Sequence, residues 1–227
     1  MTDRILVINP NSTQAVTDNI SAALDGLRFA NGPRIDCATL AEGPPGVESQ
    51  RDADGVIGPL CKLIEREPAE AYVIACFSDP GLYSAREVTA SPVFGIAQSG
   101  FATALTVGER FGVISILSKS IPRHLRYVAS LGLTARLAGD RAIEMGVVEL
   151  QQEDKVMRRM TEVGEQLKQD DGADVLVLGC AGMARYRADL QERLGVPVID
   201  PTQAAAGQAL TALSIARSRT APAHAAE

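Results

Sequence analysis

The chain has 227 residues, of which 46% are hydrophobic, 22% charged and 4% aromatic, and its formal net charge is −6. This length allows one large domain or two small ones with a real core. The acidic balance argues against a nucleic-acid or membrane partner, and the absence of a signal-peptide pattern and of any membrane-spanning apolar run leads us to expect a cytoplasmic protein.

Short apolar runs alternate along the chain with segments of helical periodicity, which predicts an α/β protein built on mostly parallel sheets. The apolar runs predict strands at 5–8, 35–40, 72–75, 91–96, 111–115, 134–138, 174–178 and 197–199. The periodic segments predict helices at 16–27, 53–64, 82–88, 98–105, 122–130, 148–169, 183–193 and 202–217. The alanine-rich end, 218–227, is expected to be disordered.

Polar residues follow the first predicted strand. Asn11 is a good N-cap, and Gln14 three residues later completes the pattern of a capping box. Open α/β sheets bind ligands at the carboxyl ends of their strands, so Asn9 and Asn11 are also candidates for substrate binding. A helix cap without any ligand role is the alternative interpretation.

Two cysteines occupy matching contexts. Cys76 follows the strand 72–75, Cys180 follows the strand 174–178, and each precedes a turn of small residues. A thiol beside the free N–H groups of a helix start has a lowered pKa and faces the ligand crevice. Cys37 and Cys61 lie on apolar stripes instead and are predicted to be core residues; all four thiols are expected to be reduced.

The order of elements in the first half of the chain returns in the second half. Asn9 and Cys76 are separated by 67 positions, and Ser115 and Cys180 by 65. The repeat predicts two similar lobes that turn their cysteine edges toward one cleft. We assign 1–97 and the last helix, about 203–217, to lobe 1 and 98–202 to lobe 2. Because the repeat places Ser115 opposite Asn9, it is a further candidate for substrate binding.

Like groups on opposite walls of a cleft suit a 1,1-proton transfer, in which one face of a carbon acid is deprotonated and the other is reprotonated. One cysteine would then be a thiolate and the other a thiol, and reversing the reaction would exchange their roles. Backbone N–H groups after each cysteine are candidates to bind the enolate oxygen. These belong to Phe77, Ser78, Ala181 and Gly182.

Three segments resemble the signature sequences of hydantoin racemases, namely 8–13 (INPNST), 75–81 (ACFSDPG) and 179–183 (GCAGM). That family belongs to the wider aspartate/glutamate racemase superfamily, which includes allantoin racemases and arylmalonate decarboxylases. The resemblance covers essentially the whole chain. It implies two pseudo-symmetric α/β lobes, a racemase that needs no cofactor, Cys76 and Cys180 as the acid/base pair, and a homo-oligomer.

The neighbours of the cysteines bear on the substrate. Phe77 and the segment 181–183 are apolar or small, which favours a neutral cyclic amide over a charged amino acid. Decarboxylases of the superfamily keep only the second cysteine, so Cys76 argues against that chemistry. By this resemblance, many family members have glycine where this chain has Ser78. The Ser78 hydroxyl is a candidate to bind the substrate ring.

The expectation is therefore a racemase of 5-substituted hydantoins that acts by two-base proton transfer at the ring carbon. An allantoin racemase of purine catabolism is the alternative, and a non-catalytic small-molecule binding protein with the same fold is an alternative of another class. Buried, inert cysteines are the simplest competing interpretation. A zinc site lacks ligands, a disulfide lacks proximity, and no phosphate-binding glycine fingerprint is present. His124, alone on its predicted helix, is typical of a structural or exposed residue.

Overall fold

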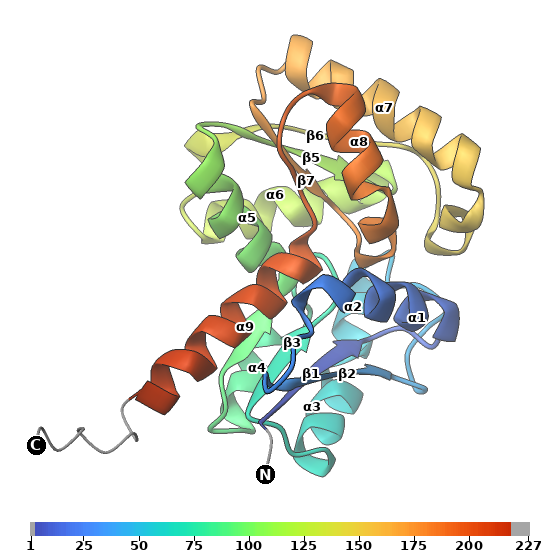
Figure 1. Ribbon diagram of the computed structural model, residues 1–227. Helices are drawn as coiled ribbons and strands as arrows, with labels where there is room; N and C mark the ends of the chain where they lie inside the picture. The colour runs from blue at the N-terminus through green and yellow to red at the C-terminus, as the bar shows by residue number, and fades with distance from the viewer. Residues whose placement is uncertain (1–2, 219–227) are drawn as a thin grey trace, which may run out of the picture.

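Two parallel four-stranded sheets form the framework of the computed structural model, which describes residues 3–218 (Figure 1). The strand order is β2-β1-β3-β4 in the first sheet and β6-β5-β7-β8 in the second. The first sheet consists of β1 (Arg4–Asn9), β2 (Arg34–Thr39), β3 (Ala71–Ile74) and β4 (Val93–Gly95). The second consists of β5 (Phe111–Ser115), β6 (Leu137–Ala142), β7 (Val175–Leu178) and β8 (Val198–Ile199).

Helices connect the strands and cover both faces of each sheet. The α-helices are α1 (Gln14–Ala23), α2 (Gln50–Gly55), α3 (Ile57–Arg66), α4 (Leu82–Glu87), α5 (Ile96–Val107), α6 (Ile121–Ser130), α7 (Glu153–Gln169), α8 (Arg187–Leu194) and α9 (Pro201–Ser218). Short 3₁₀ helices are η1 (Asp25–Leu27), η2 (Ser118–Ser120), η3 (Thr134–Arg136), η4 (Val147–Gln151) and η5 (Ala181–Tyr186). Within residues 3–218, no helix has both the length and the apolar character needed to cross a membrane.

The two sheets repeat one another in detail, which confirms the α/β class and the two-lobe architecture expected from the sequence. In each lobe the cysteine-bearing strand lies beside the first strand. The N–H of Ala75 donates to the carbonyl oxygen of Ile8 at 2.8 Å, and the N–H of Gly179 donates to that of Ile114 at 2.8 Å. Because the strands pair in the same register in both sheets, Cys76 and Cys180 occupy equivalent positions, each one residue after the residue that donates this bond.

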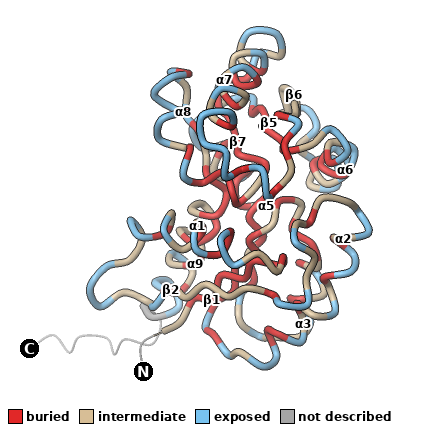
Figure 2. Tube along the Cα trace, turned by 90° about the vertical axis from the view of Figure 1, so that its right-hand side faces the viewer, coloured by how far each residue is buried: buried red, intermediate tan, exposed pale blue. Residues whose placement is uncertain are grey.

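The helical layers are exchanged between the lobes. One face of the first sheet packs against α2, α3 and α4, and its other face packs against α1 and α9. The second sheet packs against α5 and α6 on one face and against α7 and α8 on the other. The helix that follows the first sheet thus covers the second, and the last helix of the chain returns to the first (Figure 1). Buried residues follow the strands, while the outer sides of α3, α7 and α8 are exposed (Figure 2).

Three local expectations are wrong. The strand predicted at 134–138 begins at Leu137, because 134–136 form the 3₁₀ helix η3. Helix α1 has Thr13 as its N-cap, and Asn11 instead accepts a hydrogen bond from the backbone N–H of Thr13 one turn earlier. Helix α4 begins at Leu82 as predicted, but a left-handed turn separates it from Cys76, so this thiol does not lie beside a helix start as expected. Apart from Ser218 at the end of α9, the tail expected at 218–227 lies outside the described residues.

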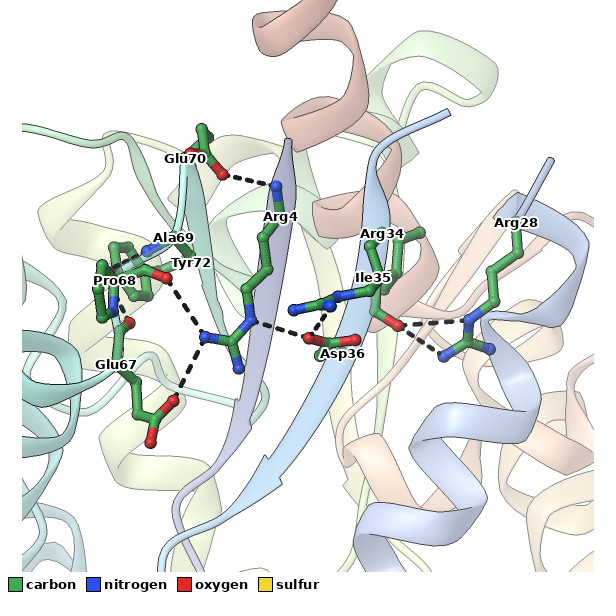
Figure 3. Close-up of polar contacts among 10 residues, drawn as sticks. All are labelled: Arg4, Arg28, Arg34, Ile35, Asp36, Glu67, Pro68, Ala69, Glu70 and Tyr72. Carbon is green, nitrogen blue, oxygen red and sulfur yellow. Dashed lines mark hydrogen bonds and ion pairs between the residues drawn. The ribbon is translucent and has the colours of Figure 1, made fainter. Parts of the chain in front are cut away.

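Charged side chains fix the amino end of the first sheet, at the edge opposite the cysteines (Figure 3). Arg4 on β1 pairs with Asp36 on β2 at 2.8 Å and with Glu67 at 3.3 Å, and its backbone N–H donates to Glu70. Partly exposed pairs of this kind contribute up to about 1 kcal/mol each. They join neighbouring segments of the sheet edge without using the carboxyl ends of the strands.

Candidate active site

A small cavity lies where the carboxyl ends of the two sheets meet, and both Cys76 and Cys180 line it. Of the other residues proposed from the sequence, Asn11, Phe77, Ala181 and Gly182 also line this cavity. The remaining walls consist of Val16, Val47, Ala75, Ile116, Ser120, Arg123, His124, Val147 and Gly179. The two cysteines thus reach one cavity from different lobes, as the repeat predicted.

Cys76 is held by a turn that folds back on the junction between the lobes. Ser78, Asp79 and Gly81 all have positive φ angles, which bend the chain sharply after the cysteine. The buried carboxylate of Asp79 accepts hydrogen bonds from the N–H groups of Ala97 and Gln98 at 2.7 and 2.8 Å, and so it caps α5. Tyr127 on α6 donates to the same carboxylate at 2.7 Å. The turn is therefore tied to both lobes.

Cys180 is held differently, at the start of the 3₁₀ helix η5. The N–H of Gly182 donates a hydrogen bond to its sulfur, as expected for a thiol at a helix start. A Cβ at Gly179 would lie 2.7 Å from the carbonyl oxygen of Ile114, so only glycine fits between the two strands there. The equivalent position in the first lobe, Ala75, carries a side chain, and this difference makes the two walls unequal.

The thiol pKa values run against the expectation that helix-start N–H groups would lower them. Burial raises the pKa of Cys76 to about 12, and the nearby Cys180 and Asp79 add to the rise while Arg123 opposes it. Burial raises the pKa of Cys180 to about 11, opposed by the Gly182 N–H and reinforced by Glu48. Loss of water around the sulfur outweighs the local donors, so both groups rest as thiols at neutral pH.

Three of the proposed binding residues lie outside the cavity wall. The Asn9 amide donates to Asn11 and Thr17 at 3.0 Å each and thereby orients the Asn11 side chain, which does reach the cavity. Ser78 lines the neighbouring surface pocket beside Tyr83 rather than the cysteine cavity. Ser115 is fully buried behind the wall.

Ser115 belongs to a buried polar cluster that the sequence did not reveal. The His124 Nδ1 atom lies 2.9 Å from the Asp140 carboxylate and 3.1 Å from the Ser115 hydroxyl, and Ser115 also donates to Asp140. The imidazole packs edge-on against the ring of Phe77, with centroids 5.0 Å apart. His124 is therefore a buried residue of the cavity wall whose ring is fixed from behind.

The start of α6 supplies the cavity residues that sequence reasoning missed: Ser120, Arg123 and His124. The Ser120 hydroxyl is buried and has no hydrogen-bond partner among residues 3–218. Buried hydroxyls are almost always bonded, so one without a partner in a cavity wall is a candidate to bind a ligand. The only sequence signal for this group was the polar turn 118–120.

The cavity is narrow. Its free volume is about 30 Å³, which is room for about two water molecules. Glu48, from the loop after β2, accepts from the N–H of Val147 at 3.0 Å and pairs with Lys119 at 3.2 Å, so it joins the two lobes beside the cavity. A ring-sized ligand therefore requires these segments to move apart.

Comparison with known proteins places this geometry in context. The sequence model of the Asp/Glu/Hydantoin racemase family matches residues 5–209. A hydantoin racemase of Paenarthrobacter aurescens is 37% identical over 208 residues, covering 89% of this chain and 87% of that protein. The structure superposes on an allantoin racemase from Klebsiella pneumoniae with a TM-score of 0.88 at 30% identity, covering 95% and 89% of the two chains. An allantoin racemase from Pseudomonas fluorescens gives 0.90 at 27% identity, covering 94% and 92%.

Proposed function

The chain belongs to the Asp/Glu/hydantoin racemase family and is an isomerase, and we propose that it racemises 5-substituted hydantoins without a cofactor. The observation that carries the proposal is the pair of cysteines, Cys76 and Cys180, which line one cavity from equivalent positions of the two lobes. A hydantoin has one acidic C–H next to a ring carbonyl. A pair of thiols, one acting as base and one as acid, therefore suffices to invert its ring carbon C5.

In the proposed reaction, the thiolate of one cysteine removes the proton from the ring carbon C5. The C–H bond breaks, an S–H bond forms, and the electron pair moves into an enolate on the adjacent carbonyl oxygen. The thiol of the other cysteine then gives its proton to the opposite face of C5 and becomes a thiolate. The product is the other enantiomer, and the positions of thiol and thiolate have been exchanged.

Polar groups of the cavity wall support binding of the planar ring. We propose that Ser120 and the Asn11 amide bind its carbonyl and N–H groups, and that the backbone N–H of Ala181 serves the oxygen that becomes the enolate. The Gly182 N–H is already directed at Cys180, so it supports the thiolate rather than the substrate. Asn9 and Ser115 act from behind, since each orients a residue of the wall.

Allantoin, itself a hydantoin, is the second candidate substrate because the allantoin racemases superpose closely over nearly the whole chain. The 37% identity to a hydantoin racemase favours the broader 5-substituted class. Assembly into a homo-oligomer stays a prediction from the family resemblance, and a cytoplasmic location stays a prediction from the sequence pattern.

The deciding experiment is proton NMR of enantiopure 5-benzylhydantoin and of allantoin in deuterated buffer, with and without the protein, alongside optical rotation. We expect protein-dependent loss of the C5 proton signal together with loss of rotation, faster for the preferred substrate. Binding of either compound without exchange would instead support a non-catalytic binding protein of this fold. Absence of both binding and exchange would refute the hydantoin proposal.

The raised thiol pKa values predict an alkaline rise in activity. Thiolate is the reactive form and the lower of the two values is about 11, that of Cys180. Below that pKa the thiolate fraction grows tenfold per pH unit, so kcat/KM should rise with a slope near one between about pH 7 and 9. A pH–rate profile in buffers of constant ionic strength measures this, and a plateau reached below pH 7 would contradict it.

A further inference from the structure

Arg123 is a buried cation without a protein counter-ion. Only 9% of the residue is exposed, and from the first turn of α6 it lines both the cysteine cavity and the neighbouring surface pocket. Among residues 3–218, no carboxylate lies within ion-pair distance of it. Arginine cannot relieve this state by losing its proton, since its pKa is far above neutrality. Buried charges are normally paired, so the partner of this one is expected to come from the reaction itself.

The one side-chain hydrogen bond of Arg123 is made to a residue with a strained backbone. Its Nε donates to the Ser78 hydroxyl at 3.0 Å, and its guanidinium makes no other hydrogen bond among residues 3–218. Ser78 has a φ of 89°, a region that glycine adopts freely and other residues rarely do. Glycine would relieve the strain but would remove the hydroxyl that fixes the guanidinium. The other four N–H donors of the guanidinium remain available to a ligand.

The proposed reaction supplies one negative charge, which passes from a thiolate to the enolate and on to the second thiolate. From the unpaired burial of Arg123 and its anchoring by Ser78, we infer that its guanidinium is the fixed counter-ion of this travelling charge, contributed by the second lobe to the Cys76 side of the cavity. This inference rests on the proposed function and names the group that stabilises its intermediate. Such a preorganised cation costs no reorganisation when the charge develops.

The inference explains how two unlike walls can perform equivalent steps. Cys180 has a backbone donor, the Gly182 N–H, whereas the turn after Cys76 has no helix start. Arg123 takes the place of that missing donor on the Cys76 side. Besides one another, the two cysteines and Arg123 are influenced electrostatically by these charged groups: Glu48, Asp52, Asp54, Asp79 and Arg126.

The test compares Arg123→Gln with Arg126→Gln, a second arginine of α6, which instead contacts Gln50 and lines only the surface pocket. Iodoacetamide alkylation of each cysteine is followed by peptide mass spectrometry across pH. In Arg123→Gln, alkylation of Cys76 at a given pH should slow about tenfold, the effect of one pKa unit. Alkylation of Cys180 in the same variant and of both cysteines in Arg126→Gln should stay within about twofold.

Kinetics of the same variants complete the test. Arg123→Gln should lower kcat/KM about 100-fold for 5-benzylhydantoin and equally for 5-(carboxymethyl)hydantoin, while Arg123→Lys, which keeps the charge, should lose about tenfold. Thermal unfolding should show Arg123→Gln to be at least as stable as the parent, because it removes an unpaired buried charge. If kcat/KM fell only for the anionic 5-(carboxymethyl)hydantoin, Arg123 would bind the substituent carboxylate instead, and this would overturn the inference.

Unchanged Cys76 alkylation in Arg123→Gln would overturn it too. The alkylation result does not depend on any substrate. If the parent racemised neither hydantoin and yet Cys76 lost reactivity in Arg123→Gln, the proposed function would fail while the electrostatic link between Arg123 and Cys76 would stand.

Discussion

Replacing either Cys76 or Cys180 by serine is expected to abolish racemisation, with kcat/KM reduced by at least about 10³-fold. A serine hydroxyl is too weak an acid to supply an alkoxide base near neutral pH, and both positions line the cavity in which the proton must be exchanged. Because each cysteine is proposed to serve one face of the ring, each variant should lose the ability to deprotonate one enantiomer.

Deuterium exchange separates this scheme from a general loss of structure. In deuterated buffer, each single variant should still exchange the C5 proton of the enantiomer that faces its remaining thiolate, without inversion. The two variants should prefer opposite enantiomers. Cys61→Ser, which alters a half-buried thiol of α3 outside the cavity, serves as the control and should keep full activity. Racemisation at the parent rate in either variant would refute the two-base scheme.

Asp79→Asn is expected to lower the free energy of unfolding by about 2 kcal/mol and to reduce kcat/KM at least about 100-fold. The Asp79 carboxylate accepts from two backbone N–H groups and from Tyr127, all three at short distance. An asparagine offers one oxygen in place of two, so it leaves at least one buried donor without an acceptor. Since this carboxylate fixes the turn that carries Cys76, the cysteine would also lose its position. Chemical denaturation and steady-state kinetics measure the two effects.

Asp200 offers a matched control because it caps α9 as Asp79 caps α5. Its Oδ1 accepts from the N–H of Thr202 at 2.9 Å, but its buried Oδ2 has no hydrogen-bond partner among the described residues. Asparagine preserves the first contact and removes a buried charge, so Asp200→Asn should unfold no more easily than the parent at pH 7.5. Equal destabilisation by the two substitutions would contradict this account.

The pH dependence of the control has a definite sign. Burial raises the pKa of Asp200 to about 6, above its value near 4 in the unfolded chain. The folded state therefore prefers the protonated acid, and the penalty for the charged form is fully present above pH 6 and disappears as the pH falls toward 4. Any stability advantage of Asp200→Asn over the parent should accordingly be largest above pH 6 and vanish near pH 4.

Most of the framework could be predicted from the sequence because buried parallel strands are short apolar runs. The run 111–115 coincides with β5, and the turns after Cys76 and Cys180 were located by the same signal. The predicted position of strand β6 is too early in the chain, because its residues, Leu137–Ala142, are half-buried and mixed in polarity at the edge of a sheet. Its place is set by pairing with β5 rather than by its own composition.

The polar half of the site could not be predicted, since it depends on contacts between distant segments. His124 resembles any lone histidine until Asp140, sixteen positions later on β6, is brought beside it. Arg123 differs from the other arginines in being buried without a counter-ion, which is a property of the folded chain. The raised pKa values of Cys76 and Cys180 could not be predicted for the same reason, because the burial that raises them arises where the two lobes meet.

The exchange of α5 and α9 between the lobes sets the order in which the chain can mature on the ribosome. The first sheet is synthesised early, but α9 (Pro201–Ser218), which covers one of its faces together with α1, is made only after all the strands of both sheets. The apolar face of β1, β3 and β4 thus stays open to water until α9 has been made. The second sheet, whose covering helices α5 to α8 all precede α9, can therefore complete its layers before the first sheet does.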